Sequence, residues 1–485
     1  MARTGHDYLT RLREQGPEVW VGAERVRDVT SHPALGPAAK EIARLYDLQM
    51  EPANREFMLF QVDGSGQWAS TQFLVPRSQD DLERRRRMHE LWARATYGLM
   101  GRTTDFIGAM VTAWYISADY FEPFTENVRK WYRTVRDEDL FVTHALISPP
   151  IDRSRPPSQW PEPYLDLGVV RETDKGLIVR GAKGIATAAA YADEILVWPY
   201  VPQGFSEPDR PYAVAFSLPT STPGLRFICR EPYGGGSPAD HPLASRFDEM
   251  DCVAIFDDVL VPWERVFINQ DIAKANGLTG GLGAGIGRGV FAFTAFQTAI
   301  RLQVKLEFVL GVVKKATEAV KRVPPFIQHM VGEVATYVYI IEACIKAAQL
   351  TAVPNEDGVL IPNGKYLSIT RVWGPWWYPR AKELLQLALS TGLIYLPARQ
   401  DAFRSPIGES IRRYFRGAEI TAEERVKLFR LAADLAVSAF GARHELYERF
   451  YAGDPFLLMA RMADSYDWPV SLAMVEDALA RTDAL

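Results

Sequence analysis

The stretch PPIDRSRPPSQWPEP, residues 149–163, divides the chain into two parts of different secondary structure. It contains six prolines, and a proline inside a helix removes a backbone donor and clashes with the preceding turn. We therefore expect an ordered loop here rather than a helix. The patterns on either side of this loop decide the fold class, because helical signals precede it and β-type signals follow it.

The part before the loop carries helical signals over roughly 140 residues. Near the N-terminus, Thr4 followed by Asp7 is typical of a helix N-cap with an acidic residue in the first turn. Farther along, Leu91, Ala95 and Leu99 recur at four-residue spacing, which favours amphipathic helix over strand. We expect a mainly helical N-terminal domain over residues 1–143.

The part after the loop reads as a series of short strands. Residues 167–180 predict a hairpin, because two β-type runs flank the sequence Thr173-Asp-Lys-Gly176. Further β-type runs follow at 194–198, 212–217, 225–229 and 251–256. Regularly spaced strands without intervening helices indicate an antiparallel barrel or sandwich, which we place at residues 144–275.

Helical patterns return after the glycine-rich stretch 277–289 and continue to the C-terminus. Four long segments are apolar on more than one face, as the core of a helix bundle requires: 291–320, 326–350, 378–396 and 421–450. We assign residues 276–485 to this bundle. The predicted fold class is therefore α+β and mainly α.

Charge and targeting signals exclude several classes of protein. The chain has 55 basic and 60 acidic residues and a net charge of −5, whereas a nucleic-acid binder usually has a basic excess. The arginine run at 84–87 follows acidic residues, so we interpret it as a solvated helix face. The N-terminus lacks the apolar core of a signal peptide, and no apolar stretch approaches the ~20 residues of a membrane helix. We expect a cytoplasmic protein.

The usual cofactor and metal motifs are missing. The sequence GLGAGIGRG at 281–289 does not satisfy GxGxxG in any register, so we interpret it as a loop before a helix, with a lid as the alternative. The three cysteines are far apart, and the seven histidines are scattered. We expect neither a disulfide framework nor a protein-bound metal.

Two local constellations carry candidate chemistry. In YGLMGRTTDF, residues 97–106, a continuous helix would place Arg102 and Phe106 on one face, with a permanent cation beside an aromatic ring. The alternative is a surface arginine and a core phenylalanine. In THALISPPIDR, residues 143–153, His144 is flanked by apolar residues and suits a partly buried acid or base near neutral pH. Its alternative is a structural histidine.

Several stretches, taken in order, carry a resemblance over nearly the whole chain. They are TGHDYLTRLRE, VWVGAERVRDVTSHPAL, YGLMGRTTDF, THALISPPIDRSR, GAKGIATAAAYADEI, VPWERVF and FGARHELYERFYAGDP. Together they resemble the large oxygenase component of two-component, reduced-flavin-dependent aromatic hydroxylases, the 4-hydroxyphenylacetate 3-monooxygenase family.

The resemblance implies an architecture and a cofactor. The architecture is acyl-CoA-dehydrogenase-like, with a helical N-terminal domain, a central antiparallel β-barrel and a C-terminal four-helix bundle, usually as a homotetramer. The cofactor is FAD, received as FADH2 from a separate NAD(P)H-flavin reductase and oxidised by O2 to a C4a-hydroperoxide. The implied reaction is hydroxylation of a phenolic or related aromatic substrate, typically ortho to the hydroxyl.

The resemblance also implies site residues in this chain. Arg102 and His144 correspond to the catalytic, phenol-contacting pair, and Phe106 lies at a substrate-binding position. The implied FAD-binding residues are His144, Ala145, Leu146, Ile147, Pro150, Ile151, Asp152, Arg153 and Thr187, together with Phe440, Gly441, Ala442 and Arg443 in a loop that reaches FAD from a neighbouring subunit.

One position departs from the family pattern and leaves alternatives open. The family usually has a tyrosine where this chain has Phe106, which points away from simple 4-hydroxyphenylacetate hydroxylation and toward a larger or non-phenolic aromatic such as an indole. Substrate selectivity is expected in loops such as 202–211 and 374–378. A catalytically silent flavin-binding homologue is a further alternative. The related 4-hydroxybutyryl-CoA dehydratase carries cluster-binding cysteines near positions 102–106, and this chain has none there.

Overall fold

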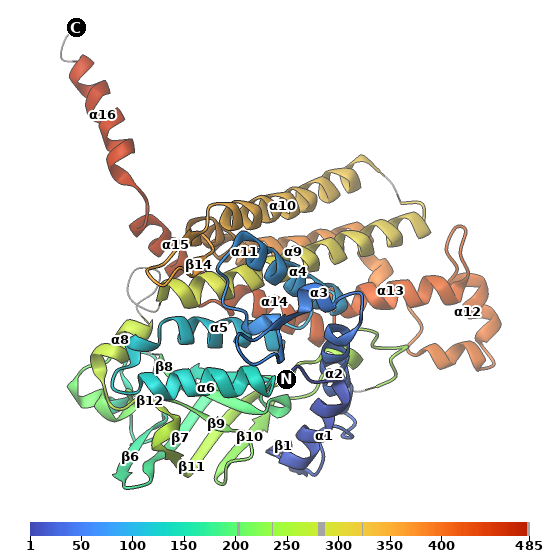
Figure 1. The fold of residues 1–485 in the computed structure, drawn as a ribbon. Coiled ribbons are helices and arrows are strands. Elements are labelled where there is room, and N and C mark those ends of the chain that lie inside the picture. Colours follow the sequence, from blue (N-terminus) through green and yellow to red (C-terminus); the bar gives the residue numbers. More distant parts are fainter. Residues whose placement is uncertain (201–203, 235, 280–286, 323, 483–485) are drawn as a thin grey trace.

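The computed structural model describes residues 1–200, 204–234, 236–279, 287–322 and 324–482. Figure 1 shows long helices packed over one face of a twisted sheet, with α5 (Thr104–Ile116) and α6 (Thr125–Asp137) between the two. None of the helices in these ranges is long and apolar enough to cross a membrane.

The N-terminal part is helical, as expected. Thr4 caps the first helix with a complete capping box, because its side chain accepts from the backbone of Asp7 and the Asp7 carboxylate accepts from the backbone of Thr4. That first helix is α1 (Gly5–Gln15), and it is followed by α2 (Gly36–Met50), α3 (Arg55–Met58) and α4 (Gln79–Ala95). Between α3 and α4 the chain forms a small ladder of β3 (Leu59–Gln61) and β4 (Trp68–Ser70).

The arginine run on α4 is not a fully solvated face. Arg85 is completely buried, and its Nη1 donates to the backbone carbonyls of Gln72 and Leu74 at 3.1 and 2.7 Å. The guanidinium therefore fastens α4 to the chain segment that precedes it. The interpretation of residues 84–87 as a solvated face is wrong at this position, because the guanidinium is buried and bonds backbone carbonyls through Nη1.

The sheet is a ten-stranded open path in the described chain rather than a purely antiparallel barrel. Its order is β12-β9-β8-β5-β7-β11-β10-β1-β2, with β6 paired to β7. The predicted hairpin over 167–180 is confirmed as the β6–β7 pair. Two pairs, β5–β8 and β1–β10, are parallel, contrary to the expectation of antiparallel pairing throughout. The strands are β1 (Glu18–Val21), β2 (Glu24–Val26), β5 (Val142–Ile147), β6 (Gly168–Thr173), β7 (Gly176–Thr187), β8 (Glu194–Tyr200), β9 (Ala215–Pro219), β10 (Leu225–Cys229), β11 (Asp251–Pro262) and β12 (Val266–Ile268).

The N-terminal segment supplies two of these strands. β1 and β2 extend the sheet beyond β10, so residues 18–26 pack with the β-rich part of the chain although the division at residue 143 assigns them to the helical part. The three-domain division itself stays a prediction.

Next to this edge, Cys229 and Cys252 are opposite each other on β10 and β11, with free thiols 3.7 Å apart.

Long helices form the C-terminal part, as predicted, with changed boundaries. They are α9 (Gly287–Ala319), α10 (Pro325–Leu350), α11 (Gly364–Leu389), α13 (Ala422–Ala436) and α14 (Ala439–Phe450). The predicted helix over 421–450 is interrupted at Val437, after which the Ser438 side chain caps α14. α11 begins well before residue 378 and contains Pro375 and Pro379. The proposal of a selectivity loop at 374–378 is therefore wrong.

The glycine-rich stretch is only partly within the described residues. α8 (Ile272–Thr279) includes its first residues, and α9 begins at Gly287, so the predicted loop over 281–289 is wrong for its last three residues, which are helical. The rest of that loop, 281–286, lies outside the described ranges, as does the start of the proposed selectivity loop at 202–203. Shorter elements complete the chain: α7 (Ala244–Phe247), α12 (Gly408–Tyr414) and the β13 (Val353–Pro354)–β14 (Leu360–Ile361) ladder.

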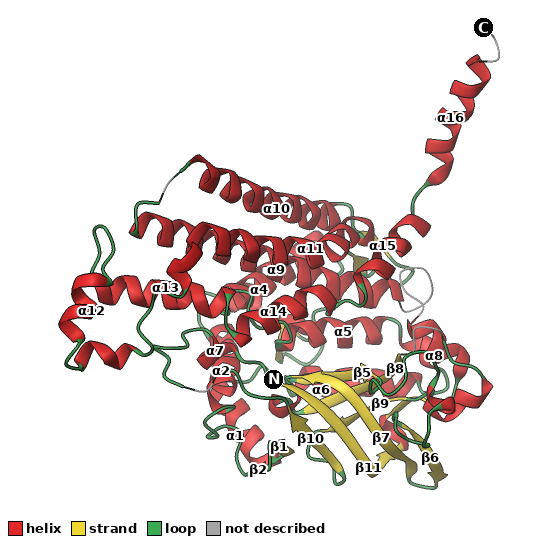
Figure 2. Ribbon diagram, turned by 180° about the vertical axis from the view of Figure 1, so that it is seen from behind, coloured by secondary structure: helices red, strands yellow, loops and turns green. Residues whose placement is uncertain are grey.

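The C-terminal helices leave the body of the molecule. α15 (Pro455–Asp464) still contacts α11, whereas α16 (Trp468–Thr482) projects away from every other element, as both ribbon views show (Figures 1 and 2). No residue of α16 is buried. Its apolar side chains, among them Trp468, Leu472, Val475 and Leu479, are all more than half exposed.

Candidate active site

Arg102 and Phe106 lie side by side at the start of α5. Thr103 is the N-cap of this helix, so Arg102 lies outside it while Phe106 is in its first turn. The Cζ atom of Arg102 nevertheless lies 4.0 Å from the centre of the Phe106 ring. The predicted placement of a cation beside an aromatic ring is confirmed. The alternative of a surface arginine is wrong, because only 7% of Arg102 is exposed.

Hydrogen bonds hold the backbone and one edge of Arg102. Its backbone N–H donates to Glu249 Oε2 at 2.9 Å, Nη1 donates to the Tyr447 hydroxyl at 2.5 Å, and Nη2 donates to the Tyr451 carbonyl at 3.4 Å. Its Nε is buried and has no partner in the described part of the chain. Because an arginine presents its donors in a rigid fork, the Nε–H is fixed in direction and available to a ligand.

His144 lies on β5, in the stretch that pairs with β8. Its ring is 5.8 Å from the ring of Phe106 and 5.4 Å from that of Trp198. The Nδ1 atom is buried, and no hydrogen bond joins either ring nitrogen to another described residue. Burial and, secondarily, the Arg102 charge hold the pKa of His144 well below its ordinary value. The imidazole is therefore neutral at pH 7 and can accept a proton.

These side chains form a buried cluster with a specific chemistry. Two aromatic faces, Phe106 and Trp198, flank a neutral imidazole and a cation whose Nε has no partner in the described chain. An aromatic ligand can pack on such faces, and an oxygen on its ring can accept from Arg102 while exchanging a proton with His144.

Two carboxylates connect this cluster to α14: Asp251 at the start of β11 and Glu249 just before that strand. Glu249 accepts from the Arg102 backbone and from Arg443 Nη1, the latter at 2.7 Å, and Asp251 accepts from Arg443 Nη2 at 2.6 Å. Burial alone raises the pKa of the Asp251 carboxyl, but the Arg443 and Arg230 guanidiniums hold it well below its ordinary value. Thr187 donates to the same carboxylate at 2.7 Å.

From His144 the chain runs outward to an exposed apolar ledge. Ile147 and Ile151 are 37% and 48% exposed, and Ile185 on the adjacent strand is 62% exposed. Exposed apolar side chains beside a buried polar cluster suit a flat aromatic ring system. Arg153 makes no ion pair within the described ranges and can hold a phosphate. These apolar and cationic side chains fit FAD. The Thr187 hydroxyl already donates its proton to Asp251, so toward FAD its oxygen would act as an acceptor.

The other implied flavin residues differ in exposure. Ala145 is buried, Leu146 and Asp152 are half-buried, and Pro150 is exposed. The implied loop at 440–443 is wrong as secondary structure, because these residues begin helix α14. Phe440, Gly441 and Arg443 are buried, the last with two carboxylate partners in its own chain, so Ala442 is the exposed member of the set.

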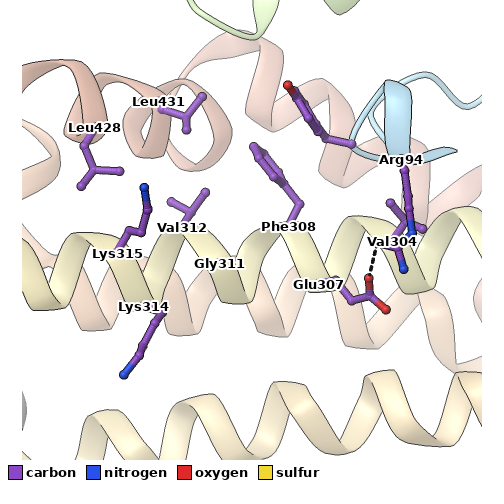
Figure 3. Close-up of a pocket in the computed structure, with 11 residues that line it drawn as sticks. Arg94, Val304, Glu307, Phe308, Gly311, Val312, Lys314, Lys315, Leu428 and Leu431 are labelled. Atoms are coloured by element: carbon purple, nitrogen blue, oxygen red, sulfur yellow. Dashed lines mark hydrogen bonds and ion pairs between the residues drawn. The ribbon is translucent and has the colours of Figure 1, made fainter. Parts of the chain in front are cut away.

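A separate cavity of about 500 Å³ lies between α9 and α13. Figure 3 shows apolar side chains, including Phe308, Val312 and Leu431, with the Arg94–Glu307 ion pair at 2.9 Å on its rim. None of the predicted site residues lines it. No group of three or more metal-binding side chains occurs in the described part of the chain.

Four residues of the site were missed from the sequence. Nothing in the local sequence marks Trp198, Glu249 or Asp251 as functional, because they lie in β-type runs or just before one. Tyr447 lies in FGARHELYERFYAGDP, a stretch that pointed to the family, but only its first four residues were assigned. Its position seven residues after Phe440 on a helix was the available signal.

Two family models cover almost the entire chain. The model for the 4-hydroxyphenylacetate 3-hydroxylase N terminal matches residues 4–268, and the model for the 4-hydroxyphenylacetate 3-hydroxylase C terminal matches residues 287–480.

Individual relatives match at full length. The 4-hydroxyphenylacetate 3-monooxygenase oxygenase component of Thermus thermophilus is 43% identical over 96% of this chain and 95% of its own length. The (3S)-3-amino-3-(3-chloro-4-hydroxyphenyl)propanoyl-[peptidyl-carrier protein SgcC2] monooxygenase of Streptomyces globisporus is 37% identical over 93% and 85%.

Solved structures give the same result for the fold. The oxygenase component of 4-hydroxyphenylacetate 3-monooxygenase, complexed with FAD and 4-hydroxyphenylacetate, superposes with a TM-score of 0.93 at 41% identity over 99% of both chains. A 4-hydroxybutyryl-CoA dehydratase from N. maritimus has a TM-score of 0.87 at 18% identity, over 99% of this chain and 95% of its own. Glutaryl-coenzyme A dehydrogenase has a TM-score of 0.50 at 13% identity, over 86% of each chain. The last two share the fold alone.

Proposed function

This chain belongs to the 4-hydroxyphenylacetate 3-hydroxylase family, and we propose that it is the oxygenase component of a two-component monooxygenase that uses FADH2 and O2 to hydroxylate a phenolic substrate. The observation that carries this proposal is the pairing of Arg102 and His144 around Phe106. Each of the two polar residues has a buried nitrogen without a partner in the described chain.

The two polar side chains divide the work on the substrate. When bound, reduced FAD would supply the electrons that activate O2 for transfer of one oxygen atom to an electron-rich aromatic carbon. His144, neutral at pH 7, accepts the proton of the phenol hydroxyl. Arg102 stabilises the resulting phenolate oxygen through its unpaired Nε–H. Deprotonation makes the ring carbons ortho and para to that oxygen electron-rich, and in a para-substituted phenol the para carbon is occupied, so hydroxylation falls ortho to the oxygen.

FAD binding is assigned to the exposed end of β5 and its neighbours. The apolar ledge of Ile147, Ile151 and Ile185 would support the flavin ring, and Arg153 would pair with a phosphate. The remaining proposed contacts are His144, Ala145, Leu146, Pro150, Asp152 and Thr187, with Phe440, Gly441, Ala442 and Arg443 at the start of α14 approaching from a neighbouring subunit. FADH2 reaches this site from a separate NAD(P)H-flavin reductase.

Self-association as a homotetramer is part of the proposal. Apolar side chains are exposed along the outer faces of α10 and α11, including Tyr339, Leu350, Trp373 and Leu387, and along the free helix α16. Such a large apolar area on a folded chain favours burial against further copies.

The test is turnover with purified components. The protein is mixed with FADH2, generated by a flavin reductase, and with O2 and a panel of phenols and indoles. We expect one oxygen atom from ¹⁸O2 to enter a phenol next to its hydroxyl, with little H2O2 released. Product from indoles but not phenols would support the larger, non-phenolic substrate instead. O2 consumption that yields only H2O2 with every substrate would support the silent flavin-binding homologue.

A further inference from the structure

Tyr447 stands at the centre of a cluster of cations between α14, α9 and the loop before α5. The Cζ atoms of Arg102, Arg301 and Arg443 lie 5.1, 5.2 and 5.1 Å from the centre of its ring. The ring also stacks on Tyr451, with 5.4 Å between the ring centres and an angle of 14°. Four neighbours therefore fix the plane of this phenol ring.

Its hydroxyl is the only side-chain hydrogen-bond partner of the Arg102 guanidinium among the described residues. Arg102 Nη1 donates to the Tyr447 oxygen at 2.5 Å, while Nε on the other side of the fork has no partner there. Because the fork is planar and rigid, fixing Nη1 also fixes the direction of Nε–H. In the described chain nothing accepts the proton of the Tyr447 hydroxyl itself.

The local sequence makes room for this contact. A Cβ atom at Gly101 would overlap the Cζ and hydroxyl oxygen of Tyr447. Any other residue at position 101 would therefore push the phenol away from Arg102.

A second ion-pair system fixes the other face of the ring. Arg301 donates from Nη1 and Nη2 to Glu448 at 2.6 and 2.8 Å, and Lys305 donates to the same carboxylate at 2.8 Å. Arg301 is therefore not free to take the place of Arg102. Burial raises the pKa of Tyr447 to about 12, against the opposing effect of Arg102 and Arg301, so its hydroxyl stays neutral at working pH.

From this geometry we infer that Tyr447 is a positioning residue, which aims the Arg102 guanidinium at the ring oxygen of the bound phenol. The inference rests on the proposed function, since it assumes that Arg102 binds that oxygen. Tyr447 acts through Arg102, so its contribution should disappear when Arg102 is removed. A merely structural tyrosine would contribute equally with and without Arg102.

The experiment is a double-mutant cycle read by phenol binding. Arg102→Ala, Tyr447→Phe and the double variant are loaded with FADH2 under anaerobic conditions and titrated with 4-hydroxyphenylacetate and with the tightest phenol of the panel. Tyr378→Phe is the matched control. Its hydroxyl is also buried in the bundle, but it has no partner in the described chain and does not contact Arg102.

We expect Tyr447→Phe to weaken phenol binding roughly tenfold, with FAD affinity and thermal midpoint close to those of Tyr378→Phe. Gly101→Ala should show the same loss by displacing the phenol ring. In the Arg102→Ala background, Tyr447→Phe should have no further effect. An equal loss in both backgrounds, or no loss beyond that of Tyr378→Phe, would overturn the inference.

The outcomes separate this inference from the proposed function. If the wild-type protein binds phenols without hydroxylating them, the proposed function fails, and the binding cycle still decides the role of Tyr447. If it hydroxylates phenols and the cycle is additive, the proposed function stands and the positioning role fails. Binding of no phenol at all would overturn both.

Discussion

The Cζ atom of Arg102 lies 4.0 Å from the centre of the Phe106 ring, and the centre of the His144 ring lies 5.8 Å from the same point. A phenylalanine at this point contributes a cation–π contact and an apolar wall, but it offers no hydrogen bond. The polar groups of a substrate must therefore be held by Arg102 and His144. This relationship underlies the first two predictions.

Removal of either polar side chain should abolish hydroxylation without unfolding the protein. His144→Ala removes the proton acceptor and Arg102→Ala removes the stabilising charge, and the loss of one such group commonly costs roughly 10²-fold or more in rate. Product formation per O2 consumed is the measurement, with FAD binding checked separately. His329→Ala, at an exposed histidine, is the control and should keep wild-type coupling. Near-wild-type coupling in both site variants would falsify the assigned roles.

Phe106→Tyr should reveal the polarity of the natural substrate. If a substrate oxygen faces this position, the new hydroxyl contributes roughly 0.5–1.5 kcal/mol, a factor of about 2 to 13 in affinity. If the substrate is apolar there, the buried hydroxyl is left without a partner at a cost of roughly 1–3 kcal/mol. We expect better turnover of small para-substituted phenols and poorer turnover of the best panel substrate.

The decisive quantity is the ratio of kcat/KM values for 4-hydroxyphenylacetate and the best substrate of the panel. An unchanged ratio in Phe106→Tyr would show that residue 106 packs the wall without selecting the substrate. Since the residue is buried, thermal unfolding of the variant should be compared with that of the wild type before the ratio is interpreted.

The sequence predicted those parts of the molecule whose signal is local. Helix and strand periodicity gave the order of helices, strands and long helices, and Arg102 and His144 stand in short motifs. Parallel pairing of β1 with β10 joins residues about 200 positions apart, which no local pattern reports. The two prolines of α11 argued against a helix over 374–378, but tertiary packing outweighed this local preference.

Long-range polar contacts explain what was missed at the site. Arg443 reaches Glu249 and Asp251 across more than 190 residues, and Tyr447 reaches Arg102 across 345. Each of these residues looks like an ordinary member of a helix or strand when taken alone. Arg85 shows the same effect, since its burial depends on carbonyls supplied by another segment.

Stability should fall between pH 7.5 and 5.5 because three histidines are buried in neutral form. Burial lowers the pKa of His89, His144 and His444 below the ordinary value of 6.5. The unfolded chain therefore binds more protons in this window, and stability is lost as the pH falls below 6.5. His144 and His444, whose pKa lies well below the ordinary value, can each contribute about 1.4 kcal/mol by pH 5.5. His89 contributes less, because its hydrogen bond to Asp105 opposes the effect of burial.

Urea unfolding midpoints at the two pH values test this expectation. Most carboxylates do not interfere, since in the unfolded chain they titrate near pH 4. Burial raises the pKa of Asp139 in the folded chain, and protonation of this carboxyl acts in the opposite direction to the histidines. His444→Gln, which removes one of the three groups, should reduce the pH dependence by about a third to a half. Equal stability at pH 7.5 and 5.5 would mean that the buried histidines are not neutral in the folded state.

Removal of α16 should lower the oligomeric state while leaving the fold intact. Trp468, Leu472, Val475 and Leu479 repeat at spacings of four, three and four, which places them on one face of the helix. All four are more than half exposed, and no residue of α16 is buried within its own chain. A chain ending at Asp464 therefore loses no intramolecular core. Burying such side chains against another copy is worth roughly 1.5–3 kcal/mol each.

Mass photometry and analytical ultracentrifugation of the full-length and truncated proteins measure this effect. We expect the truncated chain to dissociate at concentrations where the full-length protein stays assembled, with an unchanged far-UV circular dichroism spectrum per helical residue. Leu472→Asp with Val475→Asp should reproduce the dissociation in the full chain, whereas Ser471→Asp, beside the apolar face, should not. If the truncated and full-length proteins show the same mass distribution, α16 does not hold the copies together, and the exposed faces of α10 and α11 remain as the assembly surface.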